Sequence, residues 1–279
     1  MRKSIALLLT LSFLIIAIGL IGSIFLIYKK LTTNSFEYSI AEDSFIVQSV
    51  KKELRKIKID NENDLKTLFF YHFSFDKDHF RVNVSFSPIF NKININEYYK
   101  NGHINYYLDD IMNRICDKYN IQNCEFLKNI ILDTLDDDEN ERMDGSEIRL
   151  YEPFINGRIY NKEQFIKILN YYELKTKDKN VEKVPWFNIF NFDSLYTDCS
   201  NLSFKIADIL GVSPDCNSLK SFYGSKFMKN LDIMPFSKKK PYYVRVNIQY
   251  SYYSNDYEFY LIYNVKNKRI LRVEKHILY

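Results

Sequence analysis

The sequence predicts an α+β protein in which an antiparallel sheet is interrupted by a mostly helical insertion and preceded by a long apolar N-terminal helix. Three observations support this prediction. Residues 5–28 form an uncharged apolar run. Apolar and polar residues alternate over residues 80–87 and again after residue 242, which is the period of a half-buried strand. Between these regions apolar residues recur every three or four positions, which indicates helices.

The apolar run at residues 5–28 follows a short basic leader, residues 1–4. A helix rises about 1.5 Å per residue, so this run reaches roughly 36 Å and can cross a hydrocarbon core of about 30 Å. A cleaved secretory signal has a shorter apolar core and ends at a small-residue site, so an anchor is favoured over a cleaved signal. We therefore expect a single-pass membrane protein that contacts lipid through this run.

Residues 29–58 are expected to continue this helix into a folded domain, because apolar residues there keep a three- and four-residue spacing. Residues 59–98 are expected to hold the first strands of the sheet, one over residues 66–75 and one over residues 80–87. The chain would thus change from helix to strand near residue 59.

Residues 99–235 are expected to form the helical insertion. Apolar stripes at helical spacing occupy residues 108–115, 126–135, 165–172 and 202–210. Asn161, with Gln164 three positions later, predicts the N-terminus of the third helix as a capping box. Gly211 and Pro214 predict the end of the fourth.

Residues 236–279 are expected to form three antiparallel strands, because period-two alternation returns over residues 242–250, 257–263 and 271–273 with turn residues between them. Few isolated strands are stable in water. We therefore expect the strands before the insertion to join these three in one sheet.

The four cysteines predict two disulfides. Cys116, Cys124, Cys199 and Cys216 belong to no C-x-x-C pattern, and an even number in an exported domain is typical of disulfides. Four cysteines allow three connectivities, and pairing of sequence neighbours gives Cys116 with Cys124 and Cys199 with Cys216. The alternative is four reduced, buried cysteines. Basic residues flank both ends of the apolar run, so their distribution does not decide the orientation in the membrane. The cysteines favour placing the C-terminal domain outside the cytoplasm.

Composition and motifs predict no enzyme. The chain contains no P-loop, G-x-G-x-x-G, H-E-x-x-H or G-x-S-x-G motif. The net charge is only +4, and basic residues are interleaved with acidic ones, whereas nucleic-acid binders concentrate them on one face. We therefore expect no direct nucleic-acid binding.

One dense group of carboxylates follows the second predicted helix. Such closely spaced oxygen ligands suit calcium, a hard cation that takes six to eight oxygens. The spacing differs from an EF-hand, and a solvated acidic loop is the alternative. The residues predicted to hold calcium are Asp136, Asp137, Asp138, Glu139 and Glu141; no other cofactor is expected.

Three stretches of the chain carry a resemblance to a known family: residues 5–9, residues 132–138 with Gly145, Glu147 and Tyr151 downstream, and residues 156–168. They resemble, respectively, the start of a mature pseudopilin, an L-D-W-I-D-x-D and G-A-E…Y pattern, and the segment after that pattern. Together with the order of elements, they are similar to the K-type minor pseudopilin of type II secretion, general secretion pathway protein K.

The resemblance implies a structural, pilin-like subunit in the bacterial inner membrane, with its C-terminal domain in the periplasm. It implies processing between Ser4, where the family usually has glycine, and Ile5. It also implies partners, namely other minor pseudopilins and the secretion machinery. The family lacks the glutamate found at the fifth mature position of most pilins, here Leu9, which suits a subunit that caps or initiates the pseudopilus tip. A pseudopilin of a DNA-uptake system and a membrane-anchored hydrolase remain the alternatives.

Overall fold

The computed structural model describes residues 46–59, 61–77, 80–194, 196–237, 242–252 and 255–277. The chain divides into two compact units, residues 1–57 and 58–279. The predicted membrane run at residues 5–28 and the predicted processing residues, Ser4 and Ile5, lie outside the described residues. Within the described ranges, no helix combines the length and the apolar character needed to cross a bilayer.

In the first unit, residues 46–54 are helical. Ile46, Val50 and Leu54 recur every four residues and are at most 1% exposed. This spacing places them on one helical face. The described part of the segment predicted as a helix over residues 29–58 therefore has the expected conformation up to residue 54, and residues 29–45 lie outside the description.

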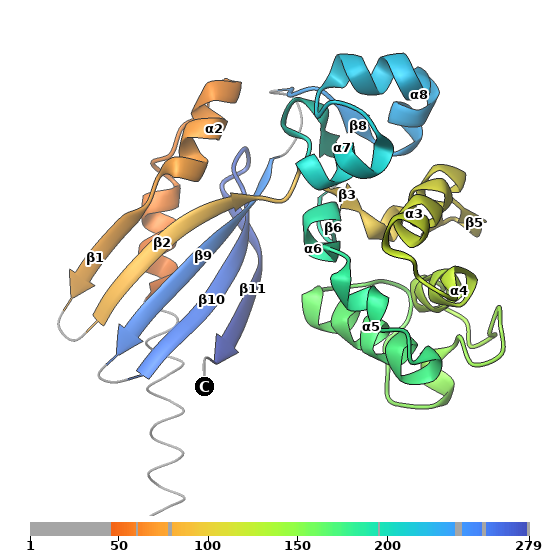
Figure 1. The fold of residues 1–279 in the computed structure, drawn as a ribbon. Coiled ribbons are helices and arrows are strands. Elements are labelled where there is room, and N and C mark those ends of the chain that lie inside the picture. Colours follow the sequence, from red (N-terminus) through yellow and green to blue (C-terminus); the bar gives the residue numbers. More distant parts are fainter. Residues whose placement is uncertain are drawn as a thin grey trace, which may run out of the picture. The chain divides into compact units, whose positions relative to one another are not determined.

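The second unit contains a five-stranded antiparallel sheet in the order β1-β2-β9-β10-β11 (Figure 1). Its strands are β1 (Phe73–Lys77), β2 (Phe80–Pro88), β9 (Tyr243–Tyr252), β10 (Asn255–Asn264) and β11 (Arg269–Ile277). Val84 of β2 lies opposite Ile248 of β9, and both are buried. This pairing confirms that strands before and after the helical region share one sheet.

The strand predicted over residues 66–75 is wrong in its first half. Residues 66–70 belong to α2 (Glu62–Phe70). Asn61 and Asp64 cap this helix reciprocally, each side chain accepting a hydrogen bond from the other's backbone N–H at 2.9 and 3.0 Å. Leu65 and Leu68, three residues apart, form its buried face. The cap upstream of the expected strand therefore determines the local structure.

A mostly helical region lies between β2 and β9 (Figure 1). Its helices are α3 (Tyr106–Tyr119), α4 (Cys124–Leu135), α5 (Lys162–Thr176), α6 (Trp186–Ile189), α7 (Phe204–Leu210) and α8 (Cys216–Asn230). Its short strands pair as β3 (Ile93–Asn94) with β6 (Phe190–Asn191), β4 (Tyr99–Lys100) with β5 (His103–Ile104), and β7 (Thr197–Asp198) with β8 (Ile233–Met234). The four apolar stripes of the sequence correspond to α3, α4, α5 and α7, whereas α6 and α8 are additional.

The helical region has its own continuous hydrophobic core, which extends in sequence from Ile93 to Ile233. Large rings fill much of it. The Phe165 ring centroid lies 5.7 Å from that of Trp186 and 5.8 Å from that of Phe192. Edge-to-face and tilted contacts of this kind add to the free energy gained from burying the rings.

Hydrogen bonds connect the start of the helical region to a segment that follows α6. The Asp198 N–H donates to the Phe90 carbonyl at 2.7 Å. The Thr197 hydroxyl donates to the Lys92 carbonyl at 3.0 Å, and the Asn94 amide donates to the Ser194 carbonyl at 2.9 Å. Buried backbone groups at this junction are therefore satisfied by both side chains and backbone.

Both disulfides of the chain lie in the helical region. Cys116 at the end of α3 is bonded to Cys124 at the start of α4, and Cys199 is bonded to Cys216 at the start of α8. These are the two pairs of sequence neighbours, and no free cysteine remains.

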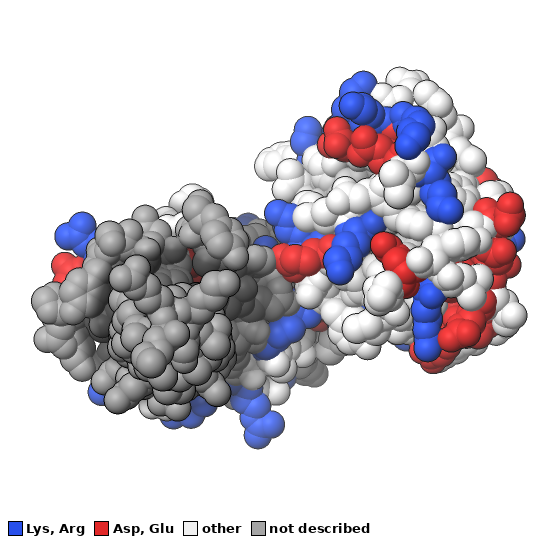
Figure 2. All heavy atoms as spheres, turned by 90° about the horizontal axis from the view of Figure 1, so that it is seen from below, with Lys and Arg blue, Asp and Glu red and all other residues white. Residues whose placement is uncertain are grey.

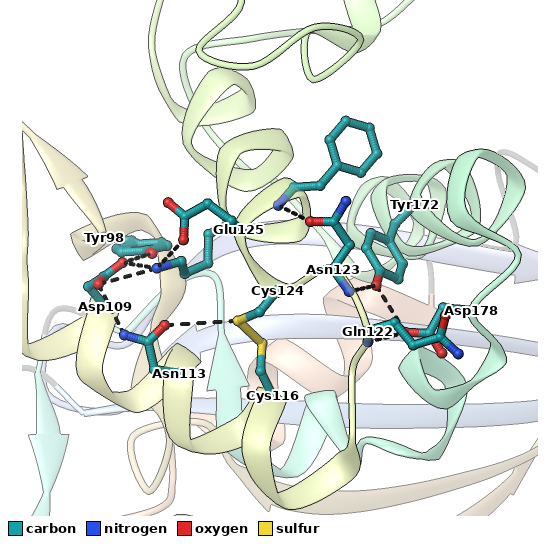
Figure 3. The surroundings of a disulfide bond; sticks show 12 residues. Tyr98, Asp109, Asn113, Cys116, Gln122, Asn123, Cys124, Glu125, Tyr172 and Asp178 are labelled. Carbon is teal, nitrogen blue, oxygen red and sulfur yellow. Dashed lines mark hydrogen bonds and ion pairs between the residues drawn. A yellow bond between two sulfur atoms is a disulfide. The ribbon is translucent and has the colours of Figure 1, made fainter.

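An ion-pair network around a buried lysine adjoins the first disulfide (Figure 3). The Lys128 side chain is only 7% exposed, and its ammonium lies 3.1 Å from Asp109 and 2.8 Å from Glu125. The Tyr98 hydroxyl donates to the same Asp109 carboxylate at 2.6 Å, and burial together with this carboxylate raises the pKa of Tyr98. The network connects α3 to α4 beside the covalent link.

Candidate functional site

The group of carboxylates predicted from the sequence forms a loop that starts in the last turn of α4. We call residues 133–147 the acidic loop. Asp136 ends α4 because its backbone is extended, with φ −90° and ψ 170°. Asp133 and Glu147 are fully buried and Asp136 is 6% exposed, whereas residues 137–141 are exposed. The loop therefore carries buried carboxylates at both of its ends and several solvated ones between them.

Arg142 is the partner of two of the buried carboxylates, Asp133 and Asp136. Its Nη1 atom donates to Asp133 Oδ1 and to Asp136 Oδ2. Its backbone N–H donates to Asp133 Oδ2 at 3.2 Å. The guanidinium carbon also lies 4.8 Å from the centroid of the Tyr99 ring, a cation–π distance. Arg142 is thus positioned by β4 as well as by the loop.

Four other carboxylates of the acidic loop have donors of their own. Glu147, which is fully buried, accepts from the Arg149 N–H at 2.9 Å and from the Asn156 amide at 2.9 Å. The exposed members have these donors: Asn140 N–H for Asp138 at 2.8 Å, Gly145 N–H for Glu141 at 2.8 Å, and the Arg149 guanidinium for Glu139 at 3.2 Å. Both oxygens of Glu147 and one oxygen of each of these exposed carboxylates are therefore engaged within the protein.

Burial dominates the electrostatics at the base of the loop. It raises the pKa of Asp136 to about 6, although Arg142 acts in the opposite direction. Burial also raises the pKa of Glu147, against the hydrogen bonds from Asn156 and Arg149. Two buried oxygens, Asp136 Oδ1 and Asn156 Oδ1, have no hydrogen-bond partner.

The predicted calcium ligands do not converge on one point. In the described part of the chain, no group of three or more His, Cys, Asp or Glu side chains is arranged to hold a metal ion. The two buried oxygens without donors, Asp136 Oδ1 and Asn156 Oδ1, are fewer than the six to eight oxygens that calcium takes. The residues thus form no ready-made ligand set, and calcium binding by Asp136, Asp137, Asp138, Glu139 and Glu141 stays a prediction.

Four residues of the site, Arg142, Ser146, Glu147 and Asn156, have contacts that the sequence does not indicate. Arg142 was not singled out, although it is a lone basic residue inside an acidic run. Glu147 belongs to the family pattern, which does not indicate that it accepts from the Asn156 amide, and the sequence does not indicate that the Ser146 hydroxyl donates to Asp133. These contacts depend on loop geometry, which spacing alone does not specify.

The surface drawn in Figure 2 presents no separate basic stripe among its described residues. Lys and Arg side chains lie between Asp and Glu side chains on this face. Proteins that follow a nucleic-acid backbone carry a basic face. The expectation of no direct nucleic-acid binding stays a prediction.

Comparison with known proteins shows a likeness of fold and not of sequence. No protein-family model and no curated protein sequence matches the chain. Among solved structures, a chain in the crystal structure of the GspK-GspI-GspJ complex from the type 2 secretion system of enterotoxigenic Escherichia coli is similar to it, with a TM-score of 0.53 and 9% sequence identity. The match covers 89% of this chain and 98% of that one. The chain therefore has a pseudopilin-like α+β fold.

Proposed function

We propose that this protein is a minor pseudopilin, a structural subunit that assembles with other pseudopilins in a type II secretion-like machine. The observation that carries the proposal is the likeness to a chain of the GspK-GspI-GspJ complex over 89% of this sequence and 98% of the neighbour. A match of that extent includes both the sheet and the helical region. Its role would be assembly rather than catalysis.

The finer part of the proposal concerns the cellular location of the chain and its position in the pseudopilus. The chain would reside in the inner membrane through residues 5–28, with the folded region in the periplasm, a compartment that permits the two disulfides. At the tip of the pseudopilus, a subunit with nothing ahead of it needs no glutamate at the position of Leu9. The apolar N-terminal segment would pack among those of its partners.

Mass spectrometry of the mature N-terminus tests the processing that this function requires. We expect a chain that begins at Ile5 and carries a methylated amine. An intact Met1 would contradict processing as a pseudopilin and leave a simple membrane anchor.

Co-purification tests the partners. A tagged full-length chain, extracted from membranes in mild detergent, should bring down other pseudopilins encoded by the same genome. A matched version without residues 1–28 is the control, since it keeps the second unit but lacks the segment proposed to pack with partners. Equal recovery of pseudopilins with both versions would contradict assembly through this segment, and recovery with neither would contradict the function.

A deletion mutant tests the process that the subunit serves. We expect proteins normally found in the growth medium to stay in the cell, and the wild-type gene to restore their release. Normal export together with loss of DNA transformation would instead assign the subunit to a DNA-uptake machine.

A further inference from the structure

Arg142 occupies the place at the base of the acidic loop where a bound cation would otherwise be expected. Asp133 and Asp136 approach the same atom, Nη1 of Arg142, and neither carboxylate is more than 6% exposed. Two like charges this close and this buried require a counter-charge or a proton. We propose that the Arg142 guanidinium is the built-in counter-ion of the acidic loop, so that the loop folds without a metal ion.

Arg142 is held in place from several directions. Its side chain is 24% exposed and lies against the Tyr99 ring, while its own backbone N–H donates to Asp133. The Ser146 hydroxyl supplies a further hydrogen bond to Asp133. A metal ion that bound both carboxylates would have to displace a guanidinium fixed by these contacts.

The rest of the loop offers no assembled ligand set to a competing metal ion. Glu147 is already bonded to two donors, and several exposed carboxylates have a donor on one of their oxygens. The buried oxygens without a hydrogen-bond partner are two, Asp136 Oδ1 and Asn156 Oδ1. Among the described residues, no three His, Cys, Asp or Glu side chains are arranged to hold a metal ion. Calcium takes at least six oxygens, so it would have to displace Arg142 and gather its remaining ligands from exposed side chains and water.

Thermal unfolding of the full-length chain in mild detergent tests the counter-ion role. Breaking a buried ion pair by removing one partner is strongly destabilising, so Arg142→Met should lower the melting temperature by about 10 °C. Arg142→Lys should lower the melting temperature by less than half as much. Both carboxylates contact the same atom of Arg142, Nη1, so the single nitrogen of a lysine can replace it. The matched control is Arg149→Met, which removes an exposed pair in the same loop, with side chains 45% and 59% exposed, and should change the melting temperature by less than about 2 °C.

Calcium addition to the wild-type chain tests the metal-free part of the proposal and does not depend on any variant folding. The melting temperature in 1 mM CaCl₂ should agree with that in EDTA to within about 1 °C, because a ligand that does not bind the folded state cannot stabilise it. A rise of about 5 °C or more with CaCl₂ but not with MgCl₂ would overturn the proposal. Equal melting temperatures for Arg142→Met and Arg149→Met would also overturn it.

Discussion

Asp136 is ion-paired and buried at the same time, and these two conditions act in opposite directions on its ionisation. Burial removes the carboxylate from water, which raises its pKa, and Arg142 returns only part of the lost stabilisation. The result is a pKa of about 6 in the folded chain against 3.8 for an ordinary Asp. Near neutral pH, the stabilisation of the ionised Asp136 carboxylate therefore depends on one neighbour, Arg142.

Replacing Asp136 by Asn should reduce the pH dependence of stability between about pH 4 and pH 6. In this window the folded state binds more protons at Asp136 than the unfolded state, so the wild-type chain loses stability as the pH rises. The loss reaches about 3 kcal/mol by neutral pH. Denaturant titrations at several pH values should show the wild-type free energy of unfolding falling relative to that of Asp136→Asn, while Asp144→Asn, an exposed neighbour, follows the wild type. A difference that stays constant with pH would contradict the expectation.

Gly157→Ala should destabilise the protein by about 1 kcal/mol, because the backbone there has φ +91°, which side chains rarely adopt. An added Cβ would lie 2.3 Å from Asp137 Oδ1, but this oxygen is the end of an exposed side chain that can turn away at little cost. Gly102→Ala is the matched control, since φ is +79° and the space beside it is open; it should cost about the same. A much larger loss in the free energy of unfolding for Gly157→Ala would contradict the expectation that Asp137 moves freely.

At the scale of elements, the two disulfides close loops of different length within the helical region. The sequence separations are 8 residues for Cys116–Cys124 and 17 for Cys199–Cys216. A longer closed loop restricts the unfolded chain more. Each bond also fixes the start of a helix, α4 or α8.

Paired substitution of the cysteines by Ala should therefore cost about 2.5 kcal/mol for Cys116 with Cys124 and about 3 kcal/mol for Cys199 with Cys216. Trp186 is the single tryptophan of the chain and is 2% exposed in the core of the helical region. Its fluorescence during denaturant titration reports unfolding of that region directly. No loss on removing either pair would contradict a structural role for the bonds.

Elements with a strong apolar periodicity could be predicted from the sequence. Elements that depend on a helix cap or on an interrupting glycine could not. β9 and β10 follow from strict alternation, and α3 follows from its apolar stripe. α2 was missed because Phe69, Phe70 and Phe73 suit a strand, whereas the Asn61 cap decides for a helix. α8 was missed because Gly224 interrupts it with φ 77° and ψ 169°, so the apolar residues on either side fall out of register.

The site shows the same division. The acidic residues can be identified in the sequence, but their hydrogen bonds and ion pairs cannot, because these depend on which donors the loop brings near each carboxylate. A run of carboxylates suggests a cation, and the cation that the structure places beside Asp133 and Asp136 is Arg142. Glu147 and Asn156 meet only because the chain turns back between them.

At the scale of the whole second unit, Arg272 of β11 connects the sheet to the helical region. Its Nη2 atom lies 2.9 Å from Asp193, and its Nη1 atom donates to the Tyr160 carbonyl. The two side chains of the ion pair are 27% and 14% exposed. The contact thus joins segments from both parts of the unit at a partly desolvated position.

Arg272→Ala should lower the free energy of unfolding by about 1–2 kcal/mol, since a charge-assisted hydrogen bond is lost. Hydrogen exchange should become faster around Tyr160 and Asp193 but not in α3, which takes no part in the contacts of Arg272 with these two residues. Arg269→Ala, an exposed position on the same strand, is the control and should leave both measurements unchanged. Uniformly faster exchange throughout the unit would indicate general destabilisation instead.

The pairing of β2 with β9 has a consequence for the order of folding during synthesis. Ser87 and Asn247, neighbours in the sheet, are 160 positions apart in the sequence, whereas both disulfides lie between them and close short loops. Contacts between distant positions form slowly because the intervening chain must first be ordered. The helical region can therefore fold and form its two disulfides before β2 pairs with β9. During that interval Val82, Val84 and Phe86 lack the strand that later lies beside them, and the unpaired edge of β2 is exposed to aggregation.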